Sequence, residues 1–197
     1  MVYLLEPVPR RWMRTAGVLG DLLRKQIDGI ALQPGDVPAE KKLEGRFELP
    51  DFGSAGDGFR FVSDRGRAAL EELTPGCVAF FPISLKVPTR MRSAEAYFFF
   101  DVLPRAQLID WDSSPTGPRL VRAADGRESR ALGSMITDPS VKFKAERPET
   151  PPIWREADLD RPTVNFFVSK KHVFLRDETW EALNARFPGQ LVARKFA

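Results

Sequence analysis

Residues 59–81 read FRFVSDRGRAALEELTPGCVAFF, and residues 173–196 read VFLRDETWEALNARFPGQLVARKF. The two stretches match without a gap at a constant offset of 113 residues. The identical pairs include Asp64 and Asp177, Ala69 and Ala182, Leu70 and Leu183, Pro75 and Pro188, and Gly76 and Gly189. Each stretch predicts a strand, a helix, a Pro-Gly turn and a second strand. The chain therefore builds one local unit twice.

The ends of the two predicted helices carry residues that start and stop helices. We expect Asp64 and Asp177 to be N-caps, because a carboxylate accepts from free amides of the first turn and faces the positive end of the helix dipole. Pro75 and Pro188 cannot continue a helix, and the glycine after each permits a left-handed turn. After the turns, the β-prone residues 77–81 and 191–193 predict the closing strands.

Each predicted helix has one apolar side at helical spacing, with charged residues opposite it. In the first copy this side consists of Gly66, Ala69, Leu70 and Leu73, and in the second of Trp180, Leu183 and Phe187. We expect both apolar sides to be buried.

The composition is that of an ordinary globular protein of one domain or two small lobes. The chain has 197 residues, of which 43% are hydrophobic and 29% charged. It is therefore long enough to bury a sizeable core without stabilising disulfides or metal sites. Its single cysteine, Cys77, excludes an internal disulfide and favours a reducing compartment. No stretch has the length of a membrane helix or the pattern of a signal peptide, so the cytoplasm is the expected location.

The formal charge of +3 is unevenly distributed. The whole surplus lies in residues 163–197, which contain Lys170, Lys171, Arg176, Arg186, Arg194 and Lys195. A solvated face is the favoured interpretation, because this pattern is sparser than the basic stripe of a nucleic-acid-binding protein.

The remaining chain contains more strands than helices. A short helix is expected within residues 12–30, a central strand buried on both faces at 94–100, and a hairpin joining 119–121 to 129–132. Further strands are expected at residues 2–5, 46–49, 107–111, 140–144 and 163–169. Without a regular β-α-β alternation, this pattern predicts an α+β fold with a mostly antiparallel sheet and a few short helices.

A proline-rich segment suggests how the chain is divided. Residues 147–162 contain four prolines among charged residues, which suits a connector or an extended strap. We therefore predict an N-terminal lobe at 1–146, this connector, and a C-terminal strand–helix–strand unit at 163–197 packed on the same domain.

The sequence contains few groupings that indicate catalysis. Asp110 and Asp112 could share one side of a strand and hold a divalent metal, but residues 112–115 equally predict a turn, which we favour. His172 follows two lysines at a predicted surface turn, and Cys77 starts an apolar strand, where we expect a small buried hydrophobe. We therefore predict no catalytic, metal-binding or cofactor-binding residues.

Several short motifs resemble a known family. The resemblance rests on Pro50-Asp51-Phe52, Phe61-Val62-Ser63, Ala69-Leu70, Phe80-Phe81-Pro82-Ile83, Tyr97-Phe98-Phe99-Phe100, Ile109-Asp110, Ser113-Ser114 and the closing stretch 173–196. With these motifs the chain resembles the bacterial polymorphic-toxin immunity family numbered eleven, over residues 45–115 and 160–197.

This resemblance implies a cytoplasmic protein without enzymatic activity that binds and neutralises one cognate toxin domain. Positions that differ between the two copies are then the better candidates for touching a partner. The expected partner-binding residues are Lys170, Lys171, Arg176, Trp180 and Arg186. Two alternatives remain open: a hydrolase or metal-dependent enzyme around Asp110 and Asp112, and a nucleic-acid-binding adaptor that uses the C-terminal basic residues.

Overall fold

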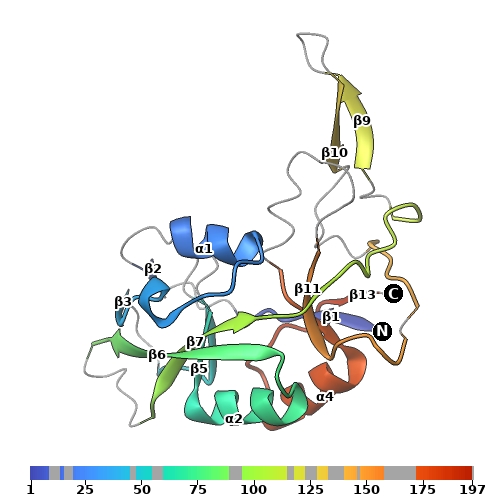
Figure 1. Ribbon diagram of the computed structural model, residues 1–197. Helices are drawn as coiled ribbons and strands as arrows, with labels where there is room; N and C mark the ends of the chain where they lie inside the picture. The colour runs from blue at the N-terminus through green and yellow to red at the C-terminus, as the bar shows by residue number, and fades with distance from the viewer. Residues whose placement is uncertain are drawn as a thin grey trace.

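The fold contains two main sheets, and two neighbouring helices, α2 (Asp64–Leu73) and α4 (Asp177–Arg186), share one core with both of them (Figure 1). The computed structural model describes residues 1–8, 14–15, 20–44, 48–54, 60–88, 95–114, 118–122, 128–132, 140–145, 147–157 and 172–196. Within these residues the strand order is β2-β3-β6-β7-β5-β4 in a six-stranded sheet and β13-β1-β12-β11-β8 in a five-stranded one.

The first copy of the repeat lies in the six-stranded sheet. It comprises the strands β4 (Phe52–Ser54), β5 (Arg60–Ser63), β6 (Val78–Lys86) and β7 (Tyr97–Val102) with the helix α2 (Asp64–Leu73). Strand β7 lies between β5 and β6 and is antiparallel to both. We call this group the first unit.

The second copy lies in the five-stranded sheet. It comprises β11 (Ile153–Glu156), β12 (Phe174–Arg176), β13 (Lys195–Phe196), the helix α4 (Asp177–Arg186) and the N-terminal strand β1 (Val2–Leu4). Strand β1 lies between β12 and β13 and is antiparallel to both, as β7 is in the first unit. We call this group the second unit.

The strand register shows that the two units are equivalent. Phe98 on β7 is paired with Val62 and Pro82. Tyr3 on β1 is paired with Leu175 and Lys195, which stand 113 residues after Val62 and Pro82. The repeat predicted from the sequence is therefore confirmed, and it extends to a middle strand that follows β6 in one unit and begins the chain in the other.

The starts of the two helices differ from the prediction. The N-cap of α2 is Ser63, whose hydroxyl accepts from the Gly66 amide at 3.2 Å, and Asp64 is the first helical residue. The N-cap of α4 is Arg176, which makes no side-chain cap. The aspartates therefore act in the first turn, where their charge still faces the positive end of the dipole.

The ends of the helices agree with the prediction and with each other. The C-caps, Thr74 and Phe187, have φ/ψ of −135°/57° and −130°/63°. Their amides donate to the Leu70 and Leu183 carbonyls at 2.8 and 2.9 Å. The glycines that follow have φ of 70° and 71°, a conformation that costs a residue with a Cβ about 1–2 kcal/mol. Both turns thus need glycine.

The apolar sides of α2 and α4 face one shared core between the sheets. The predicted burial is confirmed for Ala69, Leu70, Trp180, Leu183 and Phe187, and Leu73 packs against this core. Around this core, Phe52 meets Phe187 edge to face, with ring centroids 5.0 Å apart. The side chain of Gln190 bonds to the Phe52 amide and to Asp51. The two units are thereby joined.

The outer faces of the two sheets carry separate cores. The helix α1 (Gly20–Ile27) lies on the six-stranded sheet and places Leu22 in a core with Phe61, Phe81 and Phe99. On the five-stranded sheet, the outer core contains Trp154, Phe174 and Phe196 around Phe143. In Figure 1, α1 lies above the six-stranded sheet and the α2–α4 pair lies below it.

The other elements are short. They are the 3-10 helix Pro34–Asp36 and the strands β2 (Arg14–Thr15), β3 (Glu40–Glu44), β8 (Arg105–Ala106), β9 (Pro118–Arg122) and β10 (Glu128–Leu132). Strands β9 and β10 form the predicted hairpin, which projects from the rest of the fold (Figure 1). The predicted helix within residues 12–30 and the central strand are also confirmed.

Several predicted strands lie elsewhere. Residues 48 and 49 are not in a strand, and β3 and β4 flank them instead. Residues 107–111 and 140–144 contribute only an isolated bridge between Ile109 and Phe143, and the preceding β8 joins β11 in parallel rather than forming a hairpin. The second closing strand begins at Lys195, and Leu191 only bridges to Pro7. The predicted strand at 163–169 lies outside the described residues.

The fold class is α+β, as predicted. Among the described strands most pairs are antiparallel, with parallel pairing of β3 with β6 and of β8 with β11. The division into residues 1–146, 147–162 and 163–197 stays a prediction.

Candidate functional site

Three of the five predicted partner-binding residues lie in the described part of the chain, and Lys170 and Lys171 lie outside it. Arg176 is half-buried, forms an ion pair with Glu178 at 3.0 Å and donates to the Thr150 carbonyl at 3.4 Å. Its guanidinium thus contacts both its own helix and the turn before β11.

The other two described residues also have contacts within the fold. Trp180 is 9% exposed and stacks on Tyr3 with ring centroids 4.2 Å apart. Arg186 donates to both carboxylate oxygens of Glu72 on α2, and this hydrogen bonding lowers the pKa of Glu72 and raises that of Arg186. The structure does not gather these residues into one site, and partner binding through them stays a prediction.

The alternative enzymatic site contains a turn. The Ser113 amide donates to Asp110 at 3.2 Å, and hydrogen bonds from Ser113 lower the pKa of Asp110. The turn expected here is therefore present, although Asp110 makes this bond rather than Asp112. Within the described ranges, no group of three or more His, Cys, Asp or Glu side chains is placed to hold a metal ion.

The two residues considered for nucleophilic chemistry are half-buried. Cys77 packs against the shared core, and burial raises the pKa of its thiol. His172 is half-buried directly before the buried Val173. Cys77 and His172 each lie just before a strand of one of the two units.

A buried polar cluster joins the two sheets at α1. Asp101 on β7 accepts from Gln26 at 2.9 Å and from Arg155 on β11 at 3.4 Å. Burial, followed by the nearby Arg60, lowers the pKa of Arg155 to about 9. A buried ion pair with these hydrogen bonds fixes the relative positions of β7, β11 and α1. The sequence interpretation missed it, although charges within the apolar runs YFFFDV and IWRE are a signal for it.

Glu156 is a second buried charge that the sequence interpretation missed. It accepts from the amides of Leu108 and Ile109 at 3.4 and 3.2 Å. Burial raises its pKa to about 8, and the two amide bonds oppose this shift. The side chain thus secures the chain after β8 to the end of β11.

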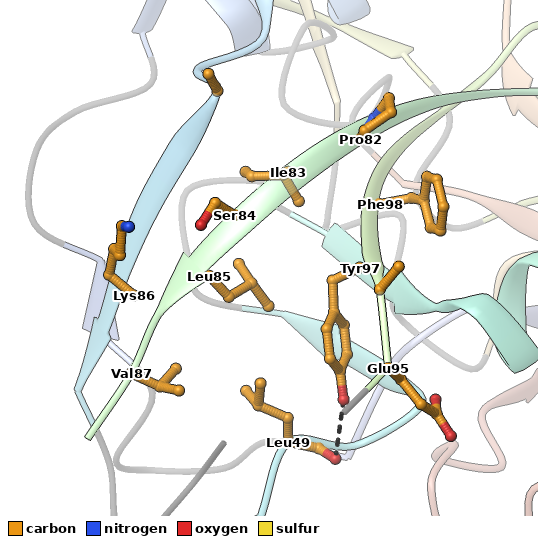
Figure 2. Close-up of a pocket in the computed structure, with 12 residues that line it drawn as sticks. Leu49, Pro82, Ile83, Ser84, Leu85, Lys86, Val87, Glu95, Tyr97 and Phe98 are labelled. Carbon is orange, nitrogen blue, oxygen red and sulfur yellow. Dashed lines mark hydrogen bonds between the residues drawn. The ribbon is translucent and has the colours of Figure 1, made fainter. Parts of the chain in front are cut away.

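A hollow on the described surface lies where β6 and β7 diverge (Figure 2). Their pairing ends at Ile83 and Tyr97, and beyond it a pocket of about 630 Å³ opens. Figure 2 shows Leu49, Leu85, Val87 and Tyr97 around this hollow. Apolar side chains thus form part of the wall, and polar and apolar atoms line the hollow about equally.

Polar groups lie at the rim of this pocket. The Tyr97 hydroxyl donates to the Leu49 carbonyl at 3.4 Å, which holds the ring across the hollow (Figure 2). Lys86 lines the pocket and forms an exposed ion pair with Glu40 at 2.9 Å, and Glu95 lines it with a half-buried side chain. Apolar side chains combined with charged residues at the edge are common in protein interfaces.

The same pocket reaches the side of the sheet that faces α2. There Phe98 is half-buried, Pro82 is exposed, and the Arg67 guanidinium of α2 lies 4.7 Å from the centre of the Phe98 ring. We call Arg67, Pro82 and Phe98, together with the pocket, the first-unit face. No motif in the sequence indicated it, because its residues read as ordinary strand and helix positions.

The second unit closes the equivalent position. Tyr3, Trp180 and Lys195 stand where Phe98, Arg67 and Pro82 stand in the first unit. Tyr3 is 7% exposed beneath the Trp180 indole, and the Lys195 ammonium lies 5.6 Å from the Tyr3 ring centre. The structure thus contains an open and a closed version of one surface.

Within the described residues, no helix has both the length and the apolar run that a membrane crossing requires.

Comparisons with known proteins identify the family. No curated protein matches the chain. The model of the immunity protein family (Imm11) matches residues 34–176, which include the whole first unit and all of the chain between α2 and α4. The chain therefore belongs to the Imm11 immunity protein family.

Proposed function

We propose that this protein is a non-enzymatic immunity protein that binds one cognate toxin domain in the cytoplasm and blocks its activity. The family match over residues 34–176 carries this proposal. An immunity protein acts by covering or distorting its toxin, so it needs a shaped surface rather than converging catalytic groups.

The first-unit face supports a binding role. It combines a half-buried aromatic ring, an arginine and a pocket lined by both apolar and polar groups, and arginine and aromatic side chains are enriched where protein interfaces carry most of their binding energy. The basic residues predicted from the sequence, Arg176 and Arg186 among them, are a second proposed region of contact.

Co-expression tests this function. Cells that express the toxin domain encoded beside this gene should stop growing, and co-expression of this protein should restore growth. The purified proteins should form a complex of nanomolar affinity, measured by calorimetry. A variant that folds like the wild type but neither binds the toxin domain nor restores growth would tie rescue to binding. If the wild type neither rescues growth nor binds the toxin domain, the proposed function is wrong.

A further inference from the structure

We propose that the toxin domain docks on the first-unit face and inserts an aromatic side chain against Phe98, between Arg67 and the pocket. This inference rests on the proposed function and assigns its binding surface. It places the contact in the first unit rather than at the equivalent position of the second.

The second unit shows what completes this surface. There, the ring of Tyr3 is covered by the Trp180 indole in a near-parallel stack, with an angle of 9° between the rings. The equivalent ring in the first unit, Phe98, has an arginine in place of the tryptophan and remains half-buried. An aromatic side chain from a partner would restore the ring-on-ring contact that the second unit makes internally. Such pairs contribute about 0.5–1.5 kcal/mol beyond the area they bury.

The charges of the face complement an aromatic partner. The Arg67 side chain is 35% exposed and forms ion pairs with Asp64 and Glu71 on its own helix, at 3.0 and 3.4 Å. These carboxylates hold the guanidinium over the Phe98 ring, 4.7 Å from its centre. An incoming ring would present its electron-rich face to this cation, an interaction of about 0.5–2 kcal/mol.

The pocket provides room for the residues beside that ring. Its volume of about 630 Å³ is in the range of pockets that accept small molecules or several side chains. Leu49, Leu85 and Val87 supply apolar walls, while Ala39 and Ala96 at its boundary are small and exposed. A loop with an aromatic residue and apolar neighbours therefore fits this face.

Ala96 offers a substitution that blocks the face without touching the core. Its side chain is exposed and lines the pocket, so Ala96→Arg fills the entrance with a long charged group. The matched control is Ala193→Arg, at an exposed alanine close to β13 in the second unit. Both variants should unfold at the wild-type temperature. Arg67→Met tests the cation, because it keeps an unbranched side chain and removes the charge.

Calorimetry with the purified toxin domain measures the effect on binding. We expect Ala96→Arg to weaken binding at least 100-fold, Arg67→Met to weaken it about 2- to 30-fold, and Ala193→Arg to leave it unchanged. Each aromatic residue on the toxin surface would also be replaced by alanine. One of these replacements should weaken binding as much as Ala96→Arg does, and its effect should not add to that of Arg67→Met.

The outcomes separate this inference from the proposed function. If the wild type does not bind the toxin domain, the proposed function fails and the docking surface fails with it. If the wild type and Ala96→Arg bind equally, only the docking surface is wrong. If the wild type self-associates in sedimentation and Ala96→Arg abolishes this without changing toxin binding, the face is a contact between two copies and the inference is overturned.

Discussion

The second unit buries the ring of its middle strand under a tryptophan, whereas the first unit leaves the equivalent ring half-buried under an arginine. Tyr3 lies beneath Trp180, and Phe98 lies beside the guanidinium of Arg67. The backbone around these residues is the same in strand order, register and helix ends. The difference between the units is therefore a difference of side chains on one scaffold.

This comparison separates two kinds of position. Two pairs that are identical at the 113-residue offset have structural roles: Leu70 and Leu183 lie in the shared core, and Gly76 and Gly189 form the turns after the helices. Positions that differ, such as Arg67 and Trp180, decide whether the surface is closed. Identity between the units thus indicates architecture, and divergence indicates where a partner can bind.

The largest expected effect separates the closed ring contact from the open one. Trp180→Ala should lower the free energy of unfolding by about 3–5 kcal/mol, because it leaves a cavity over Tyr3. Arg67→Ala, at the equivalent position, should cost about 1 kcal/mol or less, because it removes only exposed ion pairs and a cation–π contact. Urea unfolding of both variants measures the difference. Equal losses would mean that the two surfaces are not open and closed versions of one another.

A pH titration distinguishes the outer edges of the units. Strand β8 adds to β11 at the edge of the second unit, where burial raises the pKa of Glu156 from its ordinary 4.5 to about 8. Between these values the folded protein keeps a proton that the unfolded chain releases. The contribution of this bound proton to the free energy of unfolding is therefore complete below pH 4.5. It is lost as the pH rises to 8, by up to about 1.4 kcal/mol per pH unit.

Glu156→Gln should remove this pH dependence. Chemical denaturation between pH 5 and pH 8 should show a flatter profile for the variant than for the wild type. Glu181→Gln, at an exposed position on α4, serves as the control and should keep the wild-type slope. A Glu156→Gln profile parallel to that of the wild type would show that Glu156 does not hold the proton.

The two turns should respond equally to substitution. Gly76→Ala and Gly189→Ala each force an alanine into a left-handed conformation and should cost about 1–2 kcal/mol, although both positions have open space for a methyl group. Gly35→Ala has the same open space without a positive φ, so its unfolding temperature should stay near that of the wild type. A large difference between the two turn variants would break the equivalence of the units.

The smallest expected effect concerns the ion pair between the helices. A double-mutant cycle with Glu72→Ala and Arg186→Ala should give a coupling far smaller than the loss expected for Trp180→Ala, since both side chains are exposed. The coupling should shrink in high salt. A coupling as large as the Trp180→Ala loss would show that this pair, rather than the apolar core, holds the units together.

The parts of the fold that local residues determine could be predicted from the sequence. The helices and turns of both units follow from apolar spacing and from Pro75-Gly76 and Pro188-Gly189. The middle strands could not be matched, because β7 follows its unit whereas β1 begins the chain. No gapless comparison aligns Phe98 with Tyr3, and only the pairing of distant strands shows that they are equivalent.

The candidate site was harder to predict for the same reason. The sequence shows that Trp180 stands where the first unit has Arg67. It does not show that the Trp180 indole stacks on Tyr3, at the other end of the chain. The pocket likewise depends on where β6 and β7 separate, which tertiary pairing decides. The family resemblance, by contrast, rests on local motifs and is confirmed.

Hydrogen exchange on the complex tests the central claim most directly, because it reports both units in one experiment. Amide exchange would be measured for this protein alone and with the purified toxin domain. The account predicts slower exchange on binding at residues 83–87 and 95–98 of the first unit, and unchanged exchange at the equivalent strands β1 and β13. Slower exchange confined to β1 and β13, with residues 83–87 and 95–98 unchanged, would contradict it.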